Sequence, residues 1–232
     1  MGVAWLEWNG VLYWSEYRRA PHEPCSALTL LVEGIWQRFP DSAHFILRAR
    51  IFTSEPLTEM CRGAVVVCAK RSTFVPQVPD NVIARMKDRI QTVRIANNSP
   101  AQSIAHAPAQ ISRPAAHPAE FNRSVECWLL DAQGRLLATA ANTSGRNRMR
   151  HAEMNLLKSW WQRERRPLPA GSRLVVTLEP CAMCGGAIWE CVADRDNFEV
   201  NYVAADLGSA AARSVLRGRP MLRQCPNIGH PF

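Results

Sequence analysis

The sequence predicts an α/β fold organised as two similar halves, and three observations support this prediction. Strand-like and helix-like patterns alternate along the 232 residues, and a hydrophobic content of 47% is sufficient for a well-filled core. A stretch rich in proline and alanine, residues 97–120, interrupts the alternation near the middle of the chain. Motifs that precede this stretch recur after it at a nearly constant spacing.

The expected N-terminal elements are a hairpin, a helix and a strand. Asn9-Gly10 lies between two apolar runs and is typical of a tight hairpin turn. A helix is expected over residues 25–38 and a strand over residues 45–52, ahead of the pair Glu55-Pro56. These elements belong to a first predicted domain, residues 1–98.

Residues 99–120 are expected to connect two domains. They contain four prolines and few large apolar side chains. Such a composition is typical of an extended, semi-rigid linker. The second predicted domain therefore covers residues 121–232.

The second domain is expected to repeat the order of elements in the first. Residues 125–140 have the pattern of a hairpin with Gly134 in its turn. A helix should begin near Arg150, because Leu156, Leu157, Trp160 and Trp161 recur at helical spacing before the prolines at 167 and 169. The remaining expected elements are a strand over 173–178, a helix beginning near Cys181, a strand over 198–204 and a helix over 208–216.

An alignment of the two halves supports an internal duplication. Seven anchors match at offsets between 123 and 125 residues, and the elements follow in the same order. The alternative is that two generic α/β segments align by chance. The anchors are Gly10 with Gly134, Trp36 with Trp161, Glu55-Pro56 with Glu179-Pro180, Met60-Cys61 with Met183-Cys184, Gly63-Ala64 with Gly186-Ala187, Cys68 with Cys191, and Phe74 with Phe198.

Three potential zinc ligands stand at two expected helix starts. Cys181 and Cys184 are spaced i, i+3, which places both thiols on one helix face. His151 lies at the start of the preceding helix. One imidazole and two thiolates form a three-ligand zinc site with an open fourth position, which is typical of catalytic zinc. Glu153, two residues after His151, is the candidate for moving protons to and from water in that position.

The cysteine pair by itself would also fit other roles. A redox pair is one alternative, but it leaves His151 and Glu153 unexplained. A non-catalytic zinc module that binds nucleic acid is another, and the intact Glu153 argues against it because a structural site has no need of that carboxylate.

His151-Ala152-Glu153 followed by Pro180-Cys181-Ala182-Met183-Cys184 resembles the H-x-E and P-C-x-x-C signature of the cytidine-deaminase-like superfamily. The segment EPCAMCGGAI is especially similar to bacterial transfer-RNA adenosine deaminases and to guanine and cytosine deaminases. The resemblance covers residues 125–206. It implies a three-layer α/β/α fold with a central mixed sheet, duplicated in tandem if the internal alignment holds.

The same resemblance implies a reaction and a set of site residues. His151, Cys181 and Cys184 would bind one Zn²⁺ per chain, and Glu153 would carry protons during hydrolytic removal of an exocyclic amino group from a nucleobase. Asn142 and Ala152 would contact the substrate, although Asn142 in Asn-Thr-Ser-Gly would suit a turn equally well. Arg148, which alternates with Arg146 and Arg150 in the sequence, would bind a phosphate, although a solvated loop fits equally well.

In the N-terminal half, the aligned positions lack this chemistry. Ser26 and Leu28 align with His151 and Glu153, Leu57 aligns with Cys181, and only Cys61 keeps a matching thiol. We therefore expect a pseudo-catalytic domain that packs on the active one as an internal pseudo-dimer. Association of further chains stays open.

Charge and targeting features concern the substrate and the compartment. A formal net charge of +8 favours phosphate-bearing partners, so RNA or DNA is the first expectation for the substrate. A free base, nucleoside or nucleotide is the alternative, because the end segments that shape substrate access in the family differ here. No export signal or membrane span is recognisable, so the eight cysteines are expected to be thiols or metal ligands in the cytoplasm.

Overall fold

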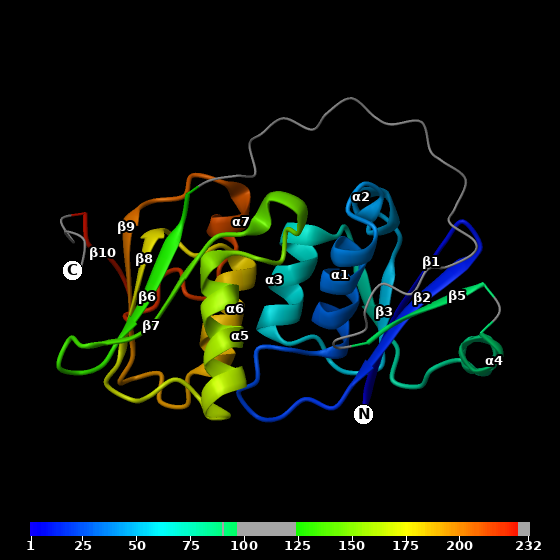
Figure 1. The fold of residues 1–232 in the computed structure, drawn as a ribbon, viewed down its shortest axis with the longest axis horizontal. Helices are drawn as coiled ribbons and strands as arrows, with labels where there is room; N and C mark the ends of the chain where they lie inside the picture. The colour runs from blue at the N-terminus through cyan, green and yellow to red at the C-terminus, as the bar shows by residue number, and fades with distance from the viewer. Residues whose placement is uncertain (90, 97–123, 227–232) are drawn as a thin grey trace.

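The fold was analysed in a computed structural model, which describes residues 1–89, 91–96 and 124–226. The predicted linker, residues 99–120, lies outside the described residues. The predicted boundaries of the two domains stay predictions. Each half of the described chain contributes one five-stranded mixed sheet (Figure 1).

The N-terminal sheet has the strand order β4-β3-β1-β2-β5. The hairpin β1–β2 is antiparallel and turns at Asn9-Gly10, where both residues have positive φ as the turn requires. β3 pairs antiparallel with β1, and β4 and β5 add parallel strands at the two edges. The strands are β1 (Gly2–Trp8), β2 (Val11–Tyr17), β3 (Ile51–Thr53), β4 (Ser72–Phe74) and β5 (Thr92–Ile95).

The C-terminal sheet has the strand order β10-β9-β8-β6-β7. The hairpin β6–β7 is antiparallel, β8 pairs antiparallel with β6, and β9 and β10 continue as parallel strands. The strands are β6 (Glu126–Leu130), β7 (Leu136–Ala141), β8 (Arg173–Leu178), β9 (Glu199–Ala204) and β10 (Leu222–Gln224).

The two sheets share a four-strand core with the same order and the same directions. β1, β2, β3 and β4 correspond to β6, β7, β8 and β9, and each matching pair of neighbours is parallel or antiparallel alike. The fifth strands break the likeness, because β5 joins the hairpin edge and β10 joins the opposite edge. This common topology supports the predicted duplication, and it confirms the α/β class with a central mixed sheet.

The four long helices α1, α3, α5 and α6 lie between the two sheets (Figure 1). α3 and α6 pack directly on each other, and buried residues of both halves form one continuous hydrophobic core. Trp160 and Trp161 of α5 are both buried, as their helical spacing predicts. The helices are α1 (Ala27–Arg38), α2 (Ala43–Ile46), α3 (Glu59–Cys68), α4 (Asp80–Asp88), α5 (Ala152–Glu164), α6 (Ala182–Cys191) and α7 (Ser209–Ala212), with a 3-10 helix over Ser144–Arg146.

Local signals explain where the helices begin and end. Ser26 forms a capping box with Thr29 at the start of α1, and the Thr58 hydroxyl accepts a hydrogen bond from Cys61 N at the start of α3. α5 ends where Arg165 adopts a left-handed conformation, two residues before Pro167.

Two sequence-based expectations are wrong. Part of the expected strand over residues 45–52 is helical, because Ala43 and Ile46 are buried in the short helix α2 and only Ile51–Thr53 pairs with β1. The expected helix over 208–216 is reduced to Ser209–Ala212, after which the chain turns so that Ser214 and Leu216 are buried beside α6. In both places tertiary packing outweighs local propensity.

No helix in the described part of the chain is long and apolar enough to cross a membrane. All eight cysteines are free thiols.

Candidate metal centre

The sequence-predicted ligands His151, Cys181 and Cys184 converge at the starts of α5 and α6. His151 is the N-cap residue of α5 and Cys181 is the N-cap residue of α6, while Cys184 lies one turn into α6. β8 ends at Leu178 and delivers the chain to Pro180-Cys181. The strand and two helix starts therefore bring together residues that are 30 positions apart in the sequence.

The geometry of the three side chains fits a tetrahedral zinc site. His151 Nδ1 lies 3.5 Å from Cys181 Sγ and 3.4 Å from Cys184 Sγ. The three ligand atoms all lie within 4.8 Å of one another, and both cysteines are buried. In tetrahedral zinc with bonds of about 2.3 Å to sulfur and 2.0–2.1 Å to nitrogen, sulfur and nitrogen ligands are about 3.6 Å apart. His151, Cys181 and Cys184 can therefore hold a zinc ion with little movement.

The three side chains shift one another's pKa values. A hydrogen bond with Cys184 lowers the pKa of Cys181, whereas burial and the nearby Cys181 thiolate raise the pKa of Cys184. Burial alone would lower the pKa of His151, but its hydrogen bond with Cys181 and the charge of that thiolate raise it. One buried thiolate is thus already stabilised by the site, which favours a cation there.

Glu153 lies beside these ligands in the first turn of α5. Its side chain is buried, with 4% of the residue exposed. Burial raises the pKa of Glu153, and the negative charge of Cys181 raises it further. A raised pKa makes the Glu153 carboxyl easier to protonate, which suits a group that must both accept and donate protons.

Glu179 is a buried carboxylate at the centre that the sequence reasoning did not single out. Its side chain is only 2% exposed, and it accepts a hydrogen bond from Asp206 N at 3.3 Å and lies 3.6 Å from Arg217 Nε. These contacts fix the turn immediately before Pro180 and Cys181. The signal available in the sequence was the match between Glu179-Pro180 and Glu55-Pro56, which gave no role for the carboxylate.

The three predicted substrate-binding residues have different environments. Asn142 Oδ1 accepts a hydrogen bond from Ser144 N at 2.9 Å, the contact expected of a turn residue. Ala152 is fully buried, so only its backbone could meet a substrate. Arg148 is half-buried, and its positive charge opposes protonation of His151. Their substrate-binding roles stay predictions.

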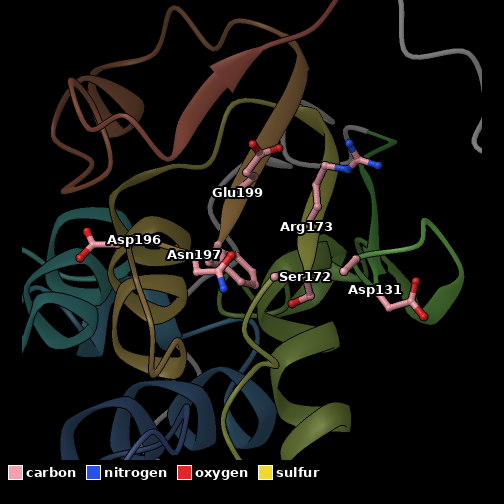
Figure 2. Close-up of a pocket in the computed structure, with 9 residues that line it drawn as sticks. Asp131, Ser172, Arg173, Asp196, Asn197 and Glu199 are labelled. Atoms are coloured by element: carbon pink, nitrogen blue, oxygen red, sulfur yellow. The ribbon is translucent and has the colours of Figure 1, made fainter.

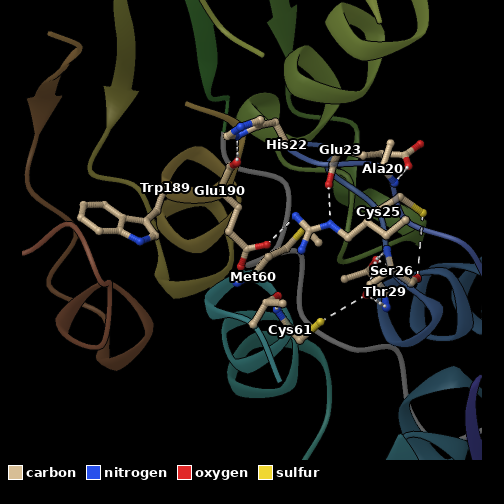
Figure 3. A network of polar contacts seen from close by, with 12 residues as sticks. Ala20, His22, Glu23, Cys25, Ser26, Thr29, Met60, Cys61, Trp189 and Glu190 are labelled. Atoms are coloured by element: carbon tan, nitrogen blue, oxygen red, sulfur yellow. Dashed lines mark hydrogen bonds and ion pairs between the residues drawn. The ribbon is translucent and has the colours of Figure 1, made fainter. Parts of the chain in front are cut away.

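Among the described residues, the corresponding place in the N-terminal half holds no comparable ligand group. Ser26 is the N-cap residue of α1, the position that His151 has in α5, and Ser26 Oγ lies 3.2 Å from Cys61 Sγ (Figure 3). Thr58, not Leu57, is the N-cap residue of α3 and so takes the place of Cys181. The sequence alignment was one residue off here, because the N-terminal half has one more residue between its Glu-Pro pair and the helix.

Glu190 of the C-terminal half occupies the space beside the start of α3. Its Oε1 accepts a hydrogen bond from Met60 N at 2.7 Å, and its Oε2 lies 2.5 Å from Arg19 Nη2 (Figure 3). A carboxylate here stabilises the positive end of α3. The N–H group of Met60 in the first turn of α3 is therefore hydrogen-bonded to a carboxylate from the C-terminal half.

A hollow lies at the end of the C-terminal sheet opposite the metal centre. It has a volume of about 280 Å³ and is formed where β8 and β9 begin (Figure 2). None of the predicted site residues lines it. Its polar lining includes Asp131, Ser172, Arg173, Asn197 and Glu199.

The part of the chain that contains the centre is similar to one family model. Residues 117–225 match the family model described as Bd3614-like deaminase. The predicted resemblance to the cytidine-deaminase-like superfamily is confirmed. The matched region contains His151, Glu153, Cys181 and Cys184.

One solved structure similar to part of the chain comes from biochemical and structural studies of A-to-I editing by tRNA:A34 deaminases at the wobble position of transfer RNA. The sequences are 24% identical, the match covers 44% of this chain and 82% of the other, and the TM-score is 0.33. No curated protein matches the chain.

Proposed function

We propose that the protein is a zinc-dependent hydrolase that removes the exocyclic amino group of a nucleobase, and that the base belongs to RNA or DNA. The observation that carries the proposal is the meeting of His151, Cys181 and Cys184 beside the buried Glu153. Three ligands leave a fourth position for water, and a structural zinc site would have no use for Glu153.

Each residue of the centre has a distinct task in this proposal. His151, Cys181 and Cys184 would hold zinc, which when bound supplies a water molecule that is acidic enough to react near neutral pH. Glu153 would accept one proton from the attacking water and give it to the ring nitrogen. It would then accept the remaining proton of the added hydroxyl group and give it to the departing amino group, which leaves as ammonia. Burial raises the pKa of the Glu153 carboxyl, which favours its taking up a proton during the reaction.

Positive charge near the centre supports a polymeric substrate. Arg146 is exposed at the end of the 3-10 helix, and Arg148 and Arg150 follow it on the way to His151. Guanidinium groups bind phosphate well, and phosphate contacts hold a nucleic acid in register over a site. The net charge of +8 would favour approach of such a substrate.

A free base, nucleoside or nucleotide is the second candidate substrate. The observation in its favour is that Arg150 is already directed at Glu33, 3.7 Å away, so part of the positive charge is neutralised within the protein. Salt separates the candidates. Binding of a nucleic acid should weaken steeply between about 50 and 200 mM salt, whereas turnover of an uncharged base should barely respond.

We also propose that the two halves arose by duplication and that the N-terminal half is a pseudo-catalytic domain. The shared strand order and the matching helix starts support this origin. Leu28 takes the place of Glu153 and has no proton to exchange. The absence of a disulfide in the chain is compatible with the proposed cytoplasmic location.

The test measures ammonia release from bases, nucleosides, nucleotides, single-stranded DNA and transfer RNA. Wild type should release ammonia from one class of substrate, and Glu153→Gln should retain one zinc per chain while turnover falls about 10²- to 10⁴-fold. Equal turnover by the two proteins would show that Glu153 is not the proton carrier. Stoichiometric zinc with no turnover of any substrate would favour a non-catalytic zinc module.

A further inference from the structure

Glu33, in the middle of α1, joins the N-terminal half to the segment that carries His151 and Glu153. Its carboxylate forms an ion pair with Lys158 Nζ and lies 3.7 Å from Arg150 Nε. Arg150 directly precedes His151, and Lys158 lies further along α5. The Glu33 carboxylate therefore contacts one residue before His151 and one residue after Glu153 in the sequence.

The burial of these groups makes the ion pair more than a surface contact. The side chain of Glu33 is 18% exposed and that of Lys158 is 23% exposed, whereas Arg150 is 45% exposed. Removing one partner of a largely buried pair leaves the other charge poorly solvated. The Glu33–Lys158 contact should therefore hold its geometry more firmly than an exposed pair would.

The backbone of Glu33 adds a third contact to the same segment. Asn147 Nδ2 donates a hydrogen bond to the Glu33 carbonyl oxygen at 3.4 Å, while Asn147 Oδ1 accepts one from Met149 N at 3.0 Å. Met149 is fully buried, and its sulfur lies 3.5 Å from Cys68 Sγ of α3. Residues directly ahead of His151 are thus held by both α1 and α3.

Contacts within the C-terminal half secure the other side of the segment. Asn155 Nδ2 donates hydrogen bonds to Ala141 O, to Thr143 Oγ1 and to Arg150 O. These bonds tie the start of α5 to its own sheet. Support from the opposite direction comes from α1 and α3, so the position of His151 depends on both halves.

We propose that Glu33 is a positioning residue for the metal centre, a role that rests on the proposed zinc-dependent function. It holds Arg150 and Lys158 in place, and these fix the first turns of α5 so that His151 stays at ligand distance from Cys181 and Cys184. Residues that orient metal ligands typically contribute about 10- to 100-fold in metal affinity or activity. The N-terminal half thereby supports the centre without supplying a ligand.

The test measures zinc loss from wild type and Glu33→Gln with a chromophoric chelator, which requires no substrate. Glutamine keeps the size of the side chain and removes its charge. Transfer of zinc to the chelator should be about tenfold faster for the variant. Amide hydrogen exchange in residues 147–155 of the metal-free protein should also be faster in the variant. The reason is that Glu33 holds this segment through contacts with the protein, which do not require the metal.

Glu190→Gln is the matched control. Glu190 also forms an ion pair across the two halves, with Arg19, but its hydrogen bonds are with Met60 and His22, which lie outside the segment 147–158. Both variants should lower the melting temperature, and only Glu33→Gln should accelerate zinc loss. Equal acceleration by both would mean general destabilisation and would overturn the proposal.

A mutant cycle tests whether the effect passes through the named partners. If Glu33 acts through Lys158 and Arg150, adding Glu33→Gln to the double variant Lys158→Gln, Arg150→Gln should change zinc loss little further. Full additivity would contradict the proposed route. If wild type binds no zinc, the proposed function is wrong; if wild type binds zinc and Glu33→Gln behaves identically, only the positioning role is wrong.

Discussion

Gly63 of α3 and Gly186 of α6 approach each other's helix reciprocally. A Cβ atom on Gly63 would collide with the backbone of Ala182 and Met183, and one on Gly186 would collide with the backbone of Glu59 and Met60. These contacts match under the internal alignment, residue for residue. Such reciprocity is the property of an interface related by a two-fold axis, here formed within one chain.

Substituting either glycine by alanine should destabilise the protein. In an ordinary helix, Gly→Ala would stabilise by about 1 kcal/mol. Here the added methyl group meets backbone atoms that cannot move without shifting a helix, so Gly63→Ala and Gly186→Ala should each cost about 1–3 kcal/mol. Urea unfolding monitored by circular dichroism would measure the change.

Gly185→Ala provides the control for this experiment. Its new methyl group would meet the Ser214 hydroxyl, which is a side chain that can rotate, while the change in helix propensity is the same as at Gly186. The loss of stability should therefore be smaller. If Gly185→Ala and Gly186→Ala cost the same, the close approach of α3 and α6 is not the cause.

Zinc binding should depend on the cysteines of one half only. Cys184→Ser should reduce bound zinc well below one per chain, because a neutral hydroxyl replaces a thiolate ligand. Cys61→Ser, the matching change in the N-terminal half, should leave the zinc content unchanged. Metal analysis of the purified variants checks both results, and a loss of zinc in Cys61→Ser would contradict the assignment of the site.

The lost centre of the N-terminal half should be recoverable if the two helix starts correspond. Ser26→His combined with Thr58→Cys would place an imidazole and a thiol around Cys61 at the two N-cap positions, and a second zinc per chain is expected. Ser26→His with Leu57→Cys is the control, since Leu57 precedes the cap. A second zinc in the control and not in the first variant would favour the original sequence alignment.

The stability of the metal-free protein should fall with rising pH because of Glu153. Burial raises the pKa of this carboxyl, so the folded state binds more protons than the unfolded state above the ordinary glutamate range. That stabilisation is present below the unfolded pKa and is lost as the pH rises through the folded pKa. Glu153→Gln should remove this contribution and become increasingly stable relative to wild type toward neutral pH.

The measurement is urea unfolding of both metal-free proteins between pH 4 and 8. A stability difference that is independent of pH would contradict the raised pKa of Glu153. Repeating the series with Glu164→Gln gives a matched control on the same helix, because Arg163 lowers the pKa of Glu164 and the linkage then has the opposite sign.

Most of the secondary structure of the metal centre could be predicted from local patterns. The strand β8, the helix starts at His151 and Cys181 and the hairpin β6–β7 lie where alternation, spacing and proline placed them. Predictions failed where the pattern was short. The segment around Ala43–Ile46 became a helix because its apolar residues found a core contact that no local signal records.

The grouping of His151, Glu153, Cys181 and Cys184 in one centre could be predicted from the sequence, because their signature has a fixed spacing relative to two helix starts. Other positions depend on how the elements pack. Glu33, Glu179 and Thr58 acquired their positions from the packing of distant helices and turns. The physical reason is that periodicity records which face of an element is buried, whereas contacts between elements depend on how the faces of both halves meet.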